Sequence, residues 1–152
     1  MRIFVTGNAG SGKSTLAKRI AKQEGLEYFS LDSIVWQERW RKTPLAERQR
    51  KVRELIAKSS WVIDGVDDDV LEAADKVIFL DMPRRVCYYR AAKRNVRYLF
   101  SSRPELPARC PEILILPTLV KIIWRFPGRV RPKILVNGAG RGEGAFVHVW
   151  KR

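Results

Sequence analysis

The amino-acid sequence predicts an α/β fold in which a parallel sheet is covered by helices on both faces. Strand-like and helix-like segments alternate along the chain, which is the first observation behind this prediction. The second is that residues 61–63 and 77–80 form short, continuous apolar runs, as is typical of strands buried on both faces of a parallel sheet. The third is a glycine-rich stretch between the first strand and the first helix, which indicates where such a sheet binds a ligand.

The first strand and its turn run from Arg2 to Thr15 and contain a phosphate-binding motif. Gly7 and Gly12, followed by Lys13 and Ser14, fit the pattern G-x-x-x-x-G-K-[ST]. Glycines let the backbone N–H groups turn inward around an anion, and the following helix presents its positive amino end. The alternative is a flexible turn with a solvated lysine, but here the motif also lies between a strand-like and a helix-like run. We therefore expect the whole loop to bind ATP phosphates through Gly7, Asn8, Ala9, Gly10, Ser11, Gly12, Lys13, Ser14 and Thr15.

The elements after the loop follow in order. Apolar residues at helical spacing indicate a helix that stops at Gly25, and a short strand is expected at 27–31. Thr43 and Pro44 resemble the N-cap and first position of the next helix. The apolar stripe of that helix consists of Leu45, Val52, Leu55 and Ile56.

The second half of the chain is predicted to contain helices and loops before one last strand. A turn or two of helix is expected at 70–75, a long helix at about 83–100 and a loop at 101–107. An apolar helix follows at 112–126, which is broken or kinked at Pro117 and ended by Pro127 and Gly128. A shorter helix is expected at 133–136, a flexible turn at 137–144 and a strand at 145–150.

The charge distribution suggests an anionic partner. The net charge is +14, and residues 83–152 hold 16 Lys and Arg against 3 Asp and Glu, whereas residues 1–82 hold 14 against 13. Such asymmetry favours contact with nucleotide phosphates, nucleic acid or an acidic membrane surface. The alternative is a basic, solvated face that aids solubility.

Length, cysteines and apolar runs indicate one cytoplasmic domain comprising residues 1–152. Cys87 and Cys110 have neither metal-type spacing nor a secreted framework, which favours a reduced, intracellular setting. The chain starts with a strand and a phosphate loop rather than a signal peptide. The most apolar stretch, 113–126, contains charges and is too short to span a bilayer.

Three carboxylates follow predicted strands, at the edge where open α/β sheets bind ligands. We expect Asp64 to be the second magnesium anchor beside Ser14, with a turn-capping carboxylate as the alternative. Asp32 is positioned to accept a hydrogen bond from an acceptor hydroxyl and help deprotonate it, or else to cap a helix. For Asp81, the favoured interpretation is a cap on the next helix.

Aromatic and basic side chains could complete the site. Trp36 and Trp40 are suited to stacking on a base or ring, although packing roles are the more common use of tryptophan. Arg90, Arg94 and Arg97 fall at i, i+4 and i+7 on one helical face, where they could stabilise a transferring phosphoryl group. The alternative is a solvated basic face.

Two expectations concern the rest of that helix and the last strand. Val86, Val96 and Phe100 are expected to face the core. His148, the one histidine, is expected to be structural rather than a general base.

Taken together, these motifs resemble the adenylate-kinase-like P-loop proteins called DNA topology modulation proteins. The resemblance covers about residues 1–135 and rests on the phosphate loop with Asp32, on 61–65, on 79–83, on the helix with Arg90 and Arg94, on Arg103-Pro104 and on 110–112. It implies the nucleotide-kinase fold, a three-layer α/β/α arrangement with a five-stranded parallel sheet in the order 2-3-1-4-5. It also implies a basic lid at about 90–127, to which Arg90 and Arg94, and with them Arg97 and Arg103, would belong.

One stretch departs from the family pattern. After the third strand the family usually has Asn-Tyr, whereas this chain has Val66 followed by the acidic run 67–69. Acidic side chains at the phosphate edge disfavour an anionic acceptor unless they bind magnesium or point away.

The sequence therefore predicts a phosphotransferase that uses ATP and Mg²⁺ on a small acceptor, a nucleoside or nucleotide. Lys13, Asp32, Arg90 and Arg94 are the expected catalytic residues. The acceptor is expected to contact Asp32, Trp36, Arg97 and Arg103. The alternative is a nucleic-acid-binding regulator with an ATP switch or relic site, supported by the excess positive charge of residues 83–152.

Overall fold

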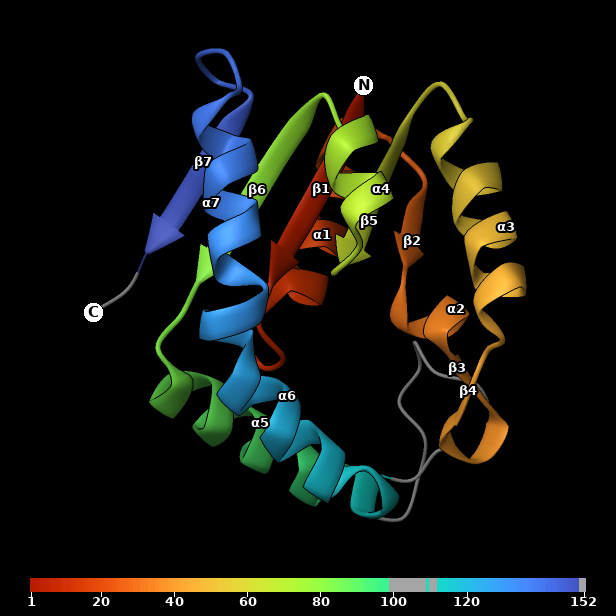
Figure 1. Ribbon diagram of the computed structural model, residues 1–152, viewed down its shortest axis with the longest axis vertical. Coiled ribbons are helices and arrows are strands. Elements are labelled where there is room, and N and C mark those ends of the chain that lie inside the picture. Colours follow the sequence, from red (N-terminus) through yellow and green to blue (C-terminus); the bar gives the residue numbers. More distant parts are fainter. Residues whose placement is uncertain (99–108, 110–111, 151–152) are drawn as a thin grey trace.

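The core of the protein is a five-stranded parallel sheet (Figure 1). The computed structural model describes residues 1–98, 109 and 112–150. The strands lie in the order β2 (Tyr28–Ser30), β5 (Trp61–Gly65), β1 (Arg2–Gly7), β6 (Lys76–Asp81) and β7 (Phe146–Trp150). All four neighbouring pairs are parallel. In chain order this is 2-3-1-4-5, so the predicted topology is confirmed.

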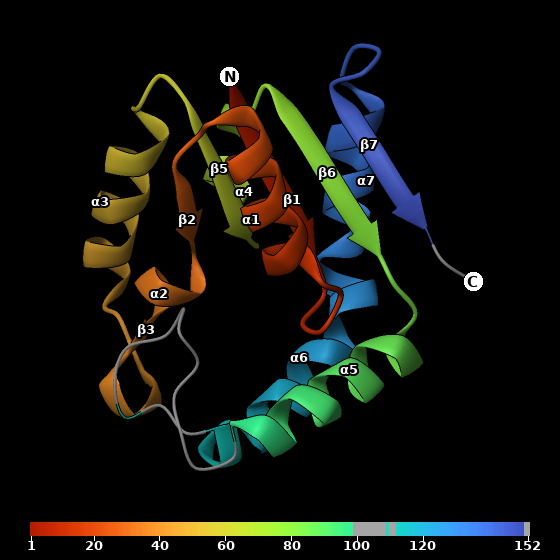
Figure 2. The ribbon, with the colours of Figure 1, turned by 180° about the vertical axis from the view of Figure 1, so that it is seen from behind.

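Helices cover both faces of this sheet, as Figures 1 and 2 show. Phe4 of β1 packs on one side, whereas its neighbours Ile3 and Val5 pack on the other. Helix α1 (Lys13–Glu24) covers the second side through Ala17 and Ala21. The first side is covered by α3 (Leu45–Ile56), α4 (Asp68–Ala73) and α7 (Arg131–Ala139). The sheet is therefore buried on both faces, as its continuous apolar runs predict.

Two further helices lie beyond the carboxyl ends of the strands (Figures 1 and 2). These are α5 (Arg84–Arg97) and α6 (Leu116–Arg129), which pack together through Cys87, Ala91, Leu119 and Ile123. None of the helices in the described part of the chain combines the length and apolar content that a membrane crossing requires.

The segment after β2 contains elements that the sequence did not predict. It forms the short helix α2 (Asp32–Val35), strand β3 (Trp36–Gln37), a 3-10 turn (Glu38–Trp40) and strand β4 (Arg41–Lys42), which pairs antiparallel with β3. Thr43 does not cap α3, because its hydroxyl donates to the Ile34 carbonyl (2.6 Å) and Pro44 takes the N-cap position. This bond fastens the end of the hairpin to α2.

Both prolines predicted to interrupt α6 are accommodated within it. Pro117 lies in the first turn, where a missing N–H costs no helical hydrogen bond, so the predicted break there is wrong. A separate 3-10 turn at Glu112–Leu114 precedes the helix. Pro127 and Gly128 do not end α6, which continues to Arg129, and the helix predicted at 133–136 is longer than expected because α7 begins at Arg131.

The buried face of α5 differs from the expected one. Val96 is 78% exposed, and the buried stripe is Cys87, Ala91 and Asn95 at four-residue spacing. Small side chains form the centre of the contact between α5 and α6, while the longer Tyr88 donates from the edge of that contact to the Val120 carbonyl of α6 (3.1 Å). Phe100 and the predicted loop at 101–107 lie outside the described residues.

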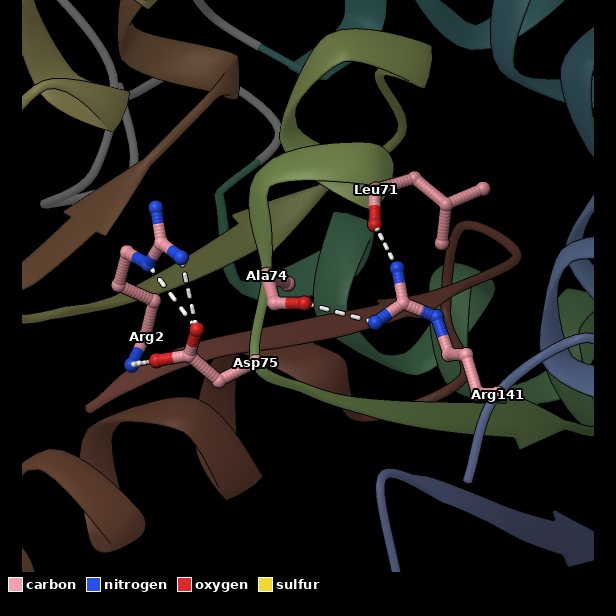
Figure 3. A network of polar contacts seen from close by, with 5 residues as sticks. All are labelled: Arg2, Leu71, Ala74, Asp75 and Arg141. Atoms are coloured by element: carbon pink, nitrogen blue, oxygen red, sulfur yellow. Dashed lines mark hydrogen bonds and ion pairs between the residues drawn. The ribbon is translucent and has the colours of Figure 1, made fainter.

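Several charges secure the edge of the sheet where the strands begin (Figure 3). Arg2 donates through its side chain to Oδ1 of Asp75 (2.8 Å) and through its backbone N–H to Oδ2 (2.8 Å). Arg141 donates to the carbonyls of Leu71 and Ala74, the latter at 2.7 Å, at the end of α4. Arg141 therefore has a structural role, although it belongs to the basic half of the chain.

Candidate functional site

The loop between β1 and α1 is shaped as an anion cradle. Gly10 and Gly12 have φ values of 78° and 96°, and a Cβ at Gly10 would lie 2.4 Å from the Cys87 carbonyl oxygen. Gly12 is the N-cap of α1, which has no acidic residue in its first turn. The amino end of the helix therefore faces the loop with N–H donors that no side chain caps, as phosphate binding requires.

Asn8 and Ser11 shape the loop rather than line its opening. Their side chains are buried, and the Ser11 N–H donates to the Asn8 carbonyl (3.1 Å). The Asn8 side chain accepts from the Ala9 N–H (2.8 Å) and donates to the Ile123 carbonyl in α6 (3.0 Å). Pro127, four residues after Ile123, has no N–H for that carbonyl. Asn8 thus supplies the donor that the helix lacks, which ties the phosphate loop to α6.

Ser14 and Asp64, the two residues expected to organise magnesium, are brought together. The Ser14 hydroxyl donates to Oδ2 of Asp64 (2.5 Å), and the Tyr28 hydroxyl donates to Oδ1 (2.9 Å). Asp64 is 1% exposed, and Lys13 lies on the same loop with Nζ 3.5 Å from the Asn8 carbonyl. Hydroxyl and carboxylate oxygens are hard ligands of the kind Mg²⁺ prefers, so the donor set fits that ion.

A cavity of about 570 Å³ opens in front of the loop. Apart from Asn8 and Ser11, every residue of the predicted phosphate loop lines it. Asp32 and Trp36, which follow β2, line it as well, and so do Arg90 and Arg94 of α5. The structure thus brings residues from these three separate stretches of the chain to one opening at the carboxyl edge of the sheet, where α/β folds bind ligands.

Of the four arginines predicted for the site, two line the cavity. Arg90 donates to the Ser11 carbonyl (2.9 Å), so its guanidinium lies against the phosphate loop. Arg94 lines the cavity one turn further along the helix. Arg97 is exposed and does not line the cavity. Arg103 lies outside the described residues, and nothing in the structure bears on its expected role.

On the other side of the cavity, Asp32 is followed by two tryptophans. Asp32 is the first residue of α2, whose N-cap is Leu31, so it is not itself the cap. The rings of Trp36 and Trp40 meet edge to face with centroids 5.5 Å apart. Arg39 and Trp40 both have positive φ values (58° and 57°), which non-glycine residues rarely adopt. The turn therefore holds Trp40 at the cavity at a cost in backbone strain.

The acidic run at 67–69 is largely neutralised by its surroundings. Asp67 caps α4 by accepting the N–H groups of Asp69 and Val70, and it also pairs with Arg48 (2.9 Å). Asp68 pairs with Lys133 (2.9 Å) at the surface. These contacts account for Asp67 and Asp68 without a metal ion.

Asp81 does not cap α5, contrary to expectation. Its carboxylate pairs with Arg131 (2.9 Å) and with Nε2 of His148 (2.9 Å), and the His148 ring stacks on Phe79. Burial raises the pKa of Asp81, but hydrogen bonds from Arg131 and His148 outweigh it, so the pKa lies below its ordinary value. This cluster joins β6, β7 and α7 and lies outside the cavity lining.

Arg48 and Tyr28 are the site residues that sequence reasoning missed. Arg48 comes from α3 and lines the cavity, whereas Tyr28 holds Asp64 from the neighbouring strand. Tyr28 lies in the predicted strand two residues before Ser30, which is paired with Asp64, and this strand pairing was the one available signal. No motif distinguishes Arg48 from the other charges on its helix.

Known relatives include several nucleotide kinases. The chain is 32% identical over 94 residues to adenylate kinase of Thermus thermophilus, a match that covers 60% of this chain and 49% of that protein. It is 28% identical over 78 residues to cytidylate kinase of Thermoplasma volcanium, covering 51% of this chain and 41% of that protein. The chain therefore spans about half the length of the curated relatives it matches.

The fold and the family follow from two wider comparisons. Shikimate kinase from Bacteroides thetaiotaomicron superimposes with a TM-score of 0.60 at 20% identity, covering 97% of this chain and 85% of that one, so the chain has the fold of a P-loop kinase. The family model described as AAA domain matches residues 3–98, from the first strand through α5. By that match over more than half of its length, the chain belongs to the AAA domain family.

Proposed function

We propose that the protein is a phosphotransferase that moves the γ-phosphoryl group of ATP, with Mg²⁺ as cofactor, to a small acceptor of the nucleoside or nucleotide class. One observation carries the proposal: a single cavity is lined by the phosphate loop, by Asp32 and by Arg90 and Arg94. Phosphoryl transfer is mostly positioning and charge stabilisation, and this cavity has groups for both. The kinase names of the relatives support the same reaction class.

Each group has a role on the donor side. The loop N–H groups and Lys13 bind the β- and γ-phosphates, while Ser14 and Asp64 hold the magnesium ion. When bound, that ion supplies charge neutralisation for the phosphate oxygens. Arg90, fixed against the Ser11 carbonyl, and Arg94 stabilise charge on the transferred group.

On the acceptor side, Asp32 orients the acceptor hydroxyl and receives its proton. The acceptor oxygen forms a bond to the γ-phosphorus while the bond from that phosphorus to the β–γ bridging oxygen breaks, which releases ADP. Trp36 contacts the ring of the acceptor. Arg103 belongs to the same proposal as an acceptor contact from the lid, whereas Arg97, which is exposed and does not line the cavity, is left out of it.

The remaining assignments are also proposals. Residues 1–152 form one domain, and the basic segment at about 90–127 acts as the lid over ATP. The placement of α5 and α6 beyond the carboxyl edge of the sheet supports this assignment (Figure 1). We also propose that the chain is related to the DNA topology modulation proteins, which its motifs resemble, and that its setting is the cytoplasm.

The proposal is tested by incubating the protein with Mg-ATP and a panel of nucleosides, nucleotides and small metabolites and measuring ADP. We expect ADP formation to depend on one acceptor class and to be lost in Lys13→Ala. Turnover that persists in Lys13→Ala, or that no acceptor stimulates, would refute the proposal.

A second candidate is a nucleic-acid-binding regulator with ATP as a switch. The observation that favours it is that α5, α6 and α7 together contain eleven basic residues and no acidic residue. Polynucleotide binding should then weaken steeply with salt, with a slope set by the number of phosphates contacted. A flat salt response would exclude this candidate.

A further inference from the structure

The cavity has a second half, away from the phosphate loop, whose lining differs in character. Its side chains include Asp32, Val35, Trp36, Trp40 and Arg48. Two indole rings and one aliphatic side chain offer apolar surface, and the Asp32 carboxylate is the hydrogen-bond acceptor among them. We assign this half to the acceptor, which rests on the proposed function, and name it the acceptor half.

The two tryptophans in this half of the cavity are suited to contact a planar group. Trp36 lies in β3 and Trp40 is the last residue of the 3-10 turn between β3 and β4, and their rings are in edge-to-face contact. Two consecutive positive φ values, at Arg39 and Trp40, hold that turn. Backbone strain of this kind persists where the surrounding structure fixes it, and it is concentrated at ligand-binding sites. A planar ring that stacks on an indole binds more tightly even when the ring carries no charge.

The arginine that lines this half of the cavity is already paired with a carboxylate. Among the described residues that line it, the basic side chain is Arg48, whose guanidinium pairs with Asp67 at 2.9 Å. The Asp67 side chain is only 11% exposed and is fixed as the cap of α4. A phosphate group that bound Arg48 here would compete with Asp67 for the guanidinium, and it would approach the negative charges of both Asp67 and Asp32.

We propose that the acceptor is an uncharged alcohol with a planar ring, a nucleoside rather than a nucleoside monophosphate. Its ring contacts the tryptophan pair, and its hydroxyl donates to Asp32. The Arg48–Asp67 pair disfavours an acceptor that carries a phosphate. Asp67 is therefore a specificity-determining residue that acts through Arg48.

The test measures selectivity by binding, independently of turnover. The full chain is saturated with Mg-ADP to fill the donor half, and tryptophan emission is followed on titration with adenosine, guanosine, cytidine, uridine or thymidine, and with the corresponding 5′-monophosphates. We expect at least one nucleoside to bind about tenfold more tightly than its monophosphate, since one lost charge-assisted contact is of that order. Equal or tighter monophosphate binding, or no binding of either class, overturns the proposal.

Two matched variants locate the cause. Asp67→Asn keeps a good helix cap while removing the charge that holds Arg48, so it should tighten monophosphate binding. The ratio of nucleoside affinity to monophosphate affinity should therefore fall about tenfold. Asp68→Asn removes the same charge from the surface pair with Lys133 and should leave the preference unchanged. An unchanged preference in Asp67→Asn, or an equal change in Asp68→Asn, contradicts the role of the Arg48–Asp67 pair.

A third variant tests the aromatic contact. Trp36→Ala should weaken nucleoside binding roughly tenfold or more, since stacking on an aromatic ring contributes that much per base. Unaltered nucleoside affinity in this variant would remove the tryptophans from the proposal. Failure of this inference is distinguishable from failure of the proposed function: ATP-dependent phosphorylation of a monophosphate overturns the inference alone, whereas nucleoside binding without ADP formation overturns the proposed function alone.

Discussion

Asn8 couples the phosphate loop to α6, and alanine at this position tests that coupling. Its side chain donates to the Ile123 carbonyl (3.0 Å) and accepts from the Ala9 N–H (2.8 Å). Asn8 and Ile123 are each 1% exposed, so the carbonyl that loses its donor is shielded from bulk water. Pro127 cannot take it over either, because it has no N–H.

The size of the effect follows from these contacts. A buried carbonyl that loses its donor costs about 1–3 kcal/mol, and the lost bond to Ala9 adds about 1 kcal/mol. We therefore expect Asn8→Ala to lower the free energy of unfolding by about 2–4 kcal/mol. For a chain of this length, each kcal/mol corresponds to roughly 2–4 °C in Tm. Because the substitution also loosens the loop, the affinity for ATP should fall.

A double-mutant cycle measured by denaturant unfolding separates this coupling from simple damage. Pro127→Ala provides a backbone N–H for the Ile123 carbonyl, so in that background the cost of Asn8→Ala should be smaller by about 1–2 kcal/mol. The hydrogen bond to the Ala9 N–H is lost in both backgrounds, so its free energy cancels from the difference between them. An equal cost in the two backgrounds would refute the assignment of Asn8 as the replacement donor.

Three further predictions follow from the site and its surroundings. Lys13→Ala should weaken ATP binding by at least about tenfold in calorimetry while leaving Tm nearly unchanged, because the contact that Nζ makes within the loop is a long one. Unchanged ATP affinity would contradict the assignment. Asp64→Asn should raise the Mg²⁺ concentration for half-maximal ADP formation by about 10- to 100-fold, and an unchanged Mg²⁺ requirement would contradict its role. The pKa of Asp81 is lowered in the fold, so its contribution to stability is present above the ordinary value of an aspartate and is lost as pH falls through the folded value. Between about pH 5 and pH 2 the wild type should therefore lose stability more steeply than Asp81→Asn, and parallel curves in denaturant melts would contradict the assignment.

Much of the sheet could be predicted because its signals are local. Continuous apolar runs mark β5 and β6, and the phosphate motif fixes the turn from β1 into α1. The strand order is not local, and it came from resemblance to a family rather than from the residues of each strand.

The helices beyond the sheet were harder to predict because tertiary contacts override local rules there. Pro127 favours a helix end because it has no N–H to donate to the carbonyl four residues earlier. Helix α6 continues past it, since the Asn8 side chain of the phosphate loop donates to that carbonyl, which belongs to Ile123. Val96 looks like a core residue, yet α5 buries Cys87 and Ala91 because it packs closely against α6.

In the candidate site too, the residues marked by local signals could be predicted, whereas those positioned by tertiary contacts could not. Ser14 and Asp64 were predicted as partners because each follows a recognisable strand, and the structure brings their oxygens together. Arg48 and its pairing with Asp67 depend on where α3 and α4 lie relative to each other, which no spacing in the sequence reveals. Asp81 was misinterpreted for the same reason, since its partners Arg131 and His148 come from elements much later in the chain.

The central claim is that the phosphate loop and the acceptor half of the cavity together perform phosphoryl transfer. The most direct measurement follows label from γ-³²P ATP in the presence of Mg²⁺ and each nucleoside of the binding panel. The account predicts that label appears in a nucleoside monophosphate in equal amount to the ADP formed, and that Lys13→Ala and Asp32→Asn abolish this product. Label that appears only as free phosphate, or remains in ATP with every acceptor, would contradict it.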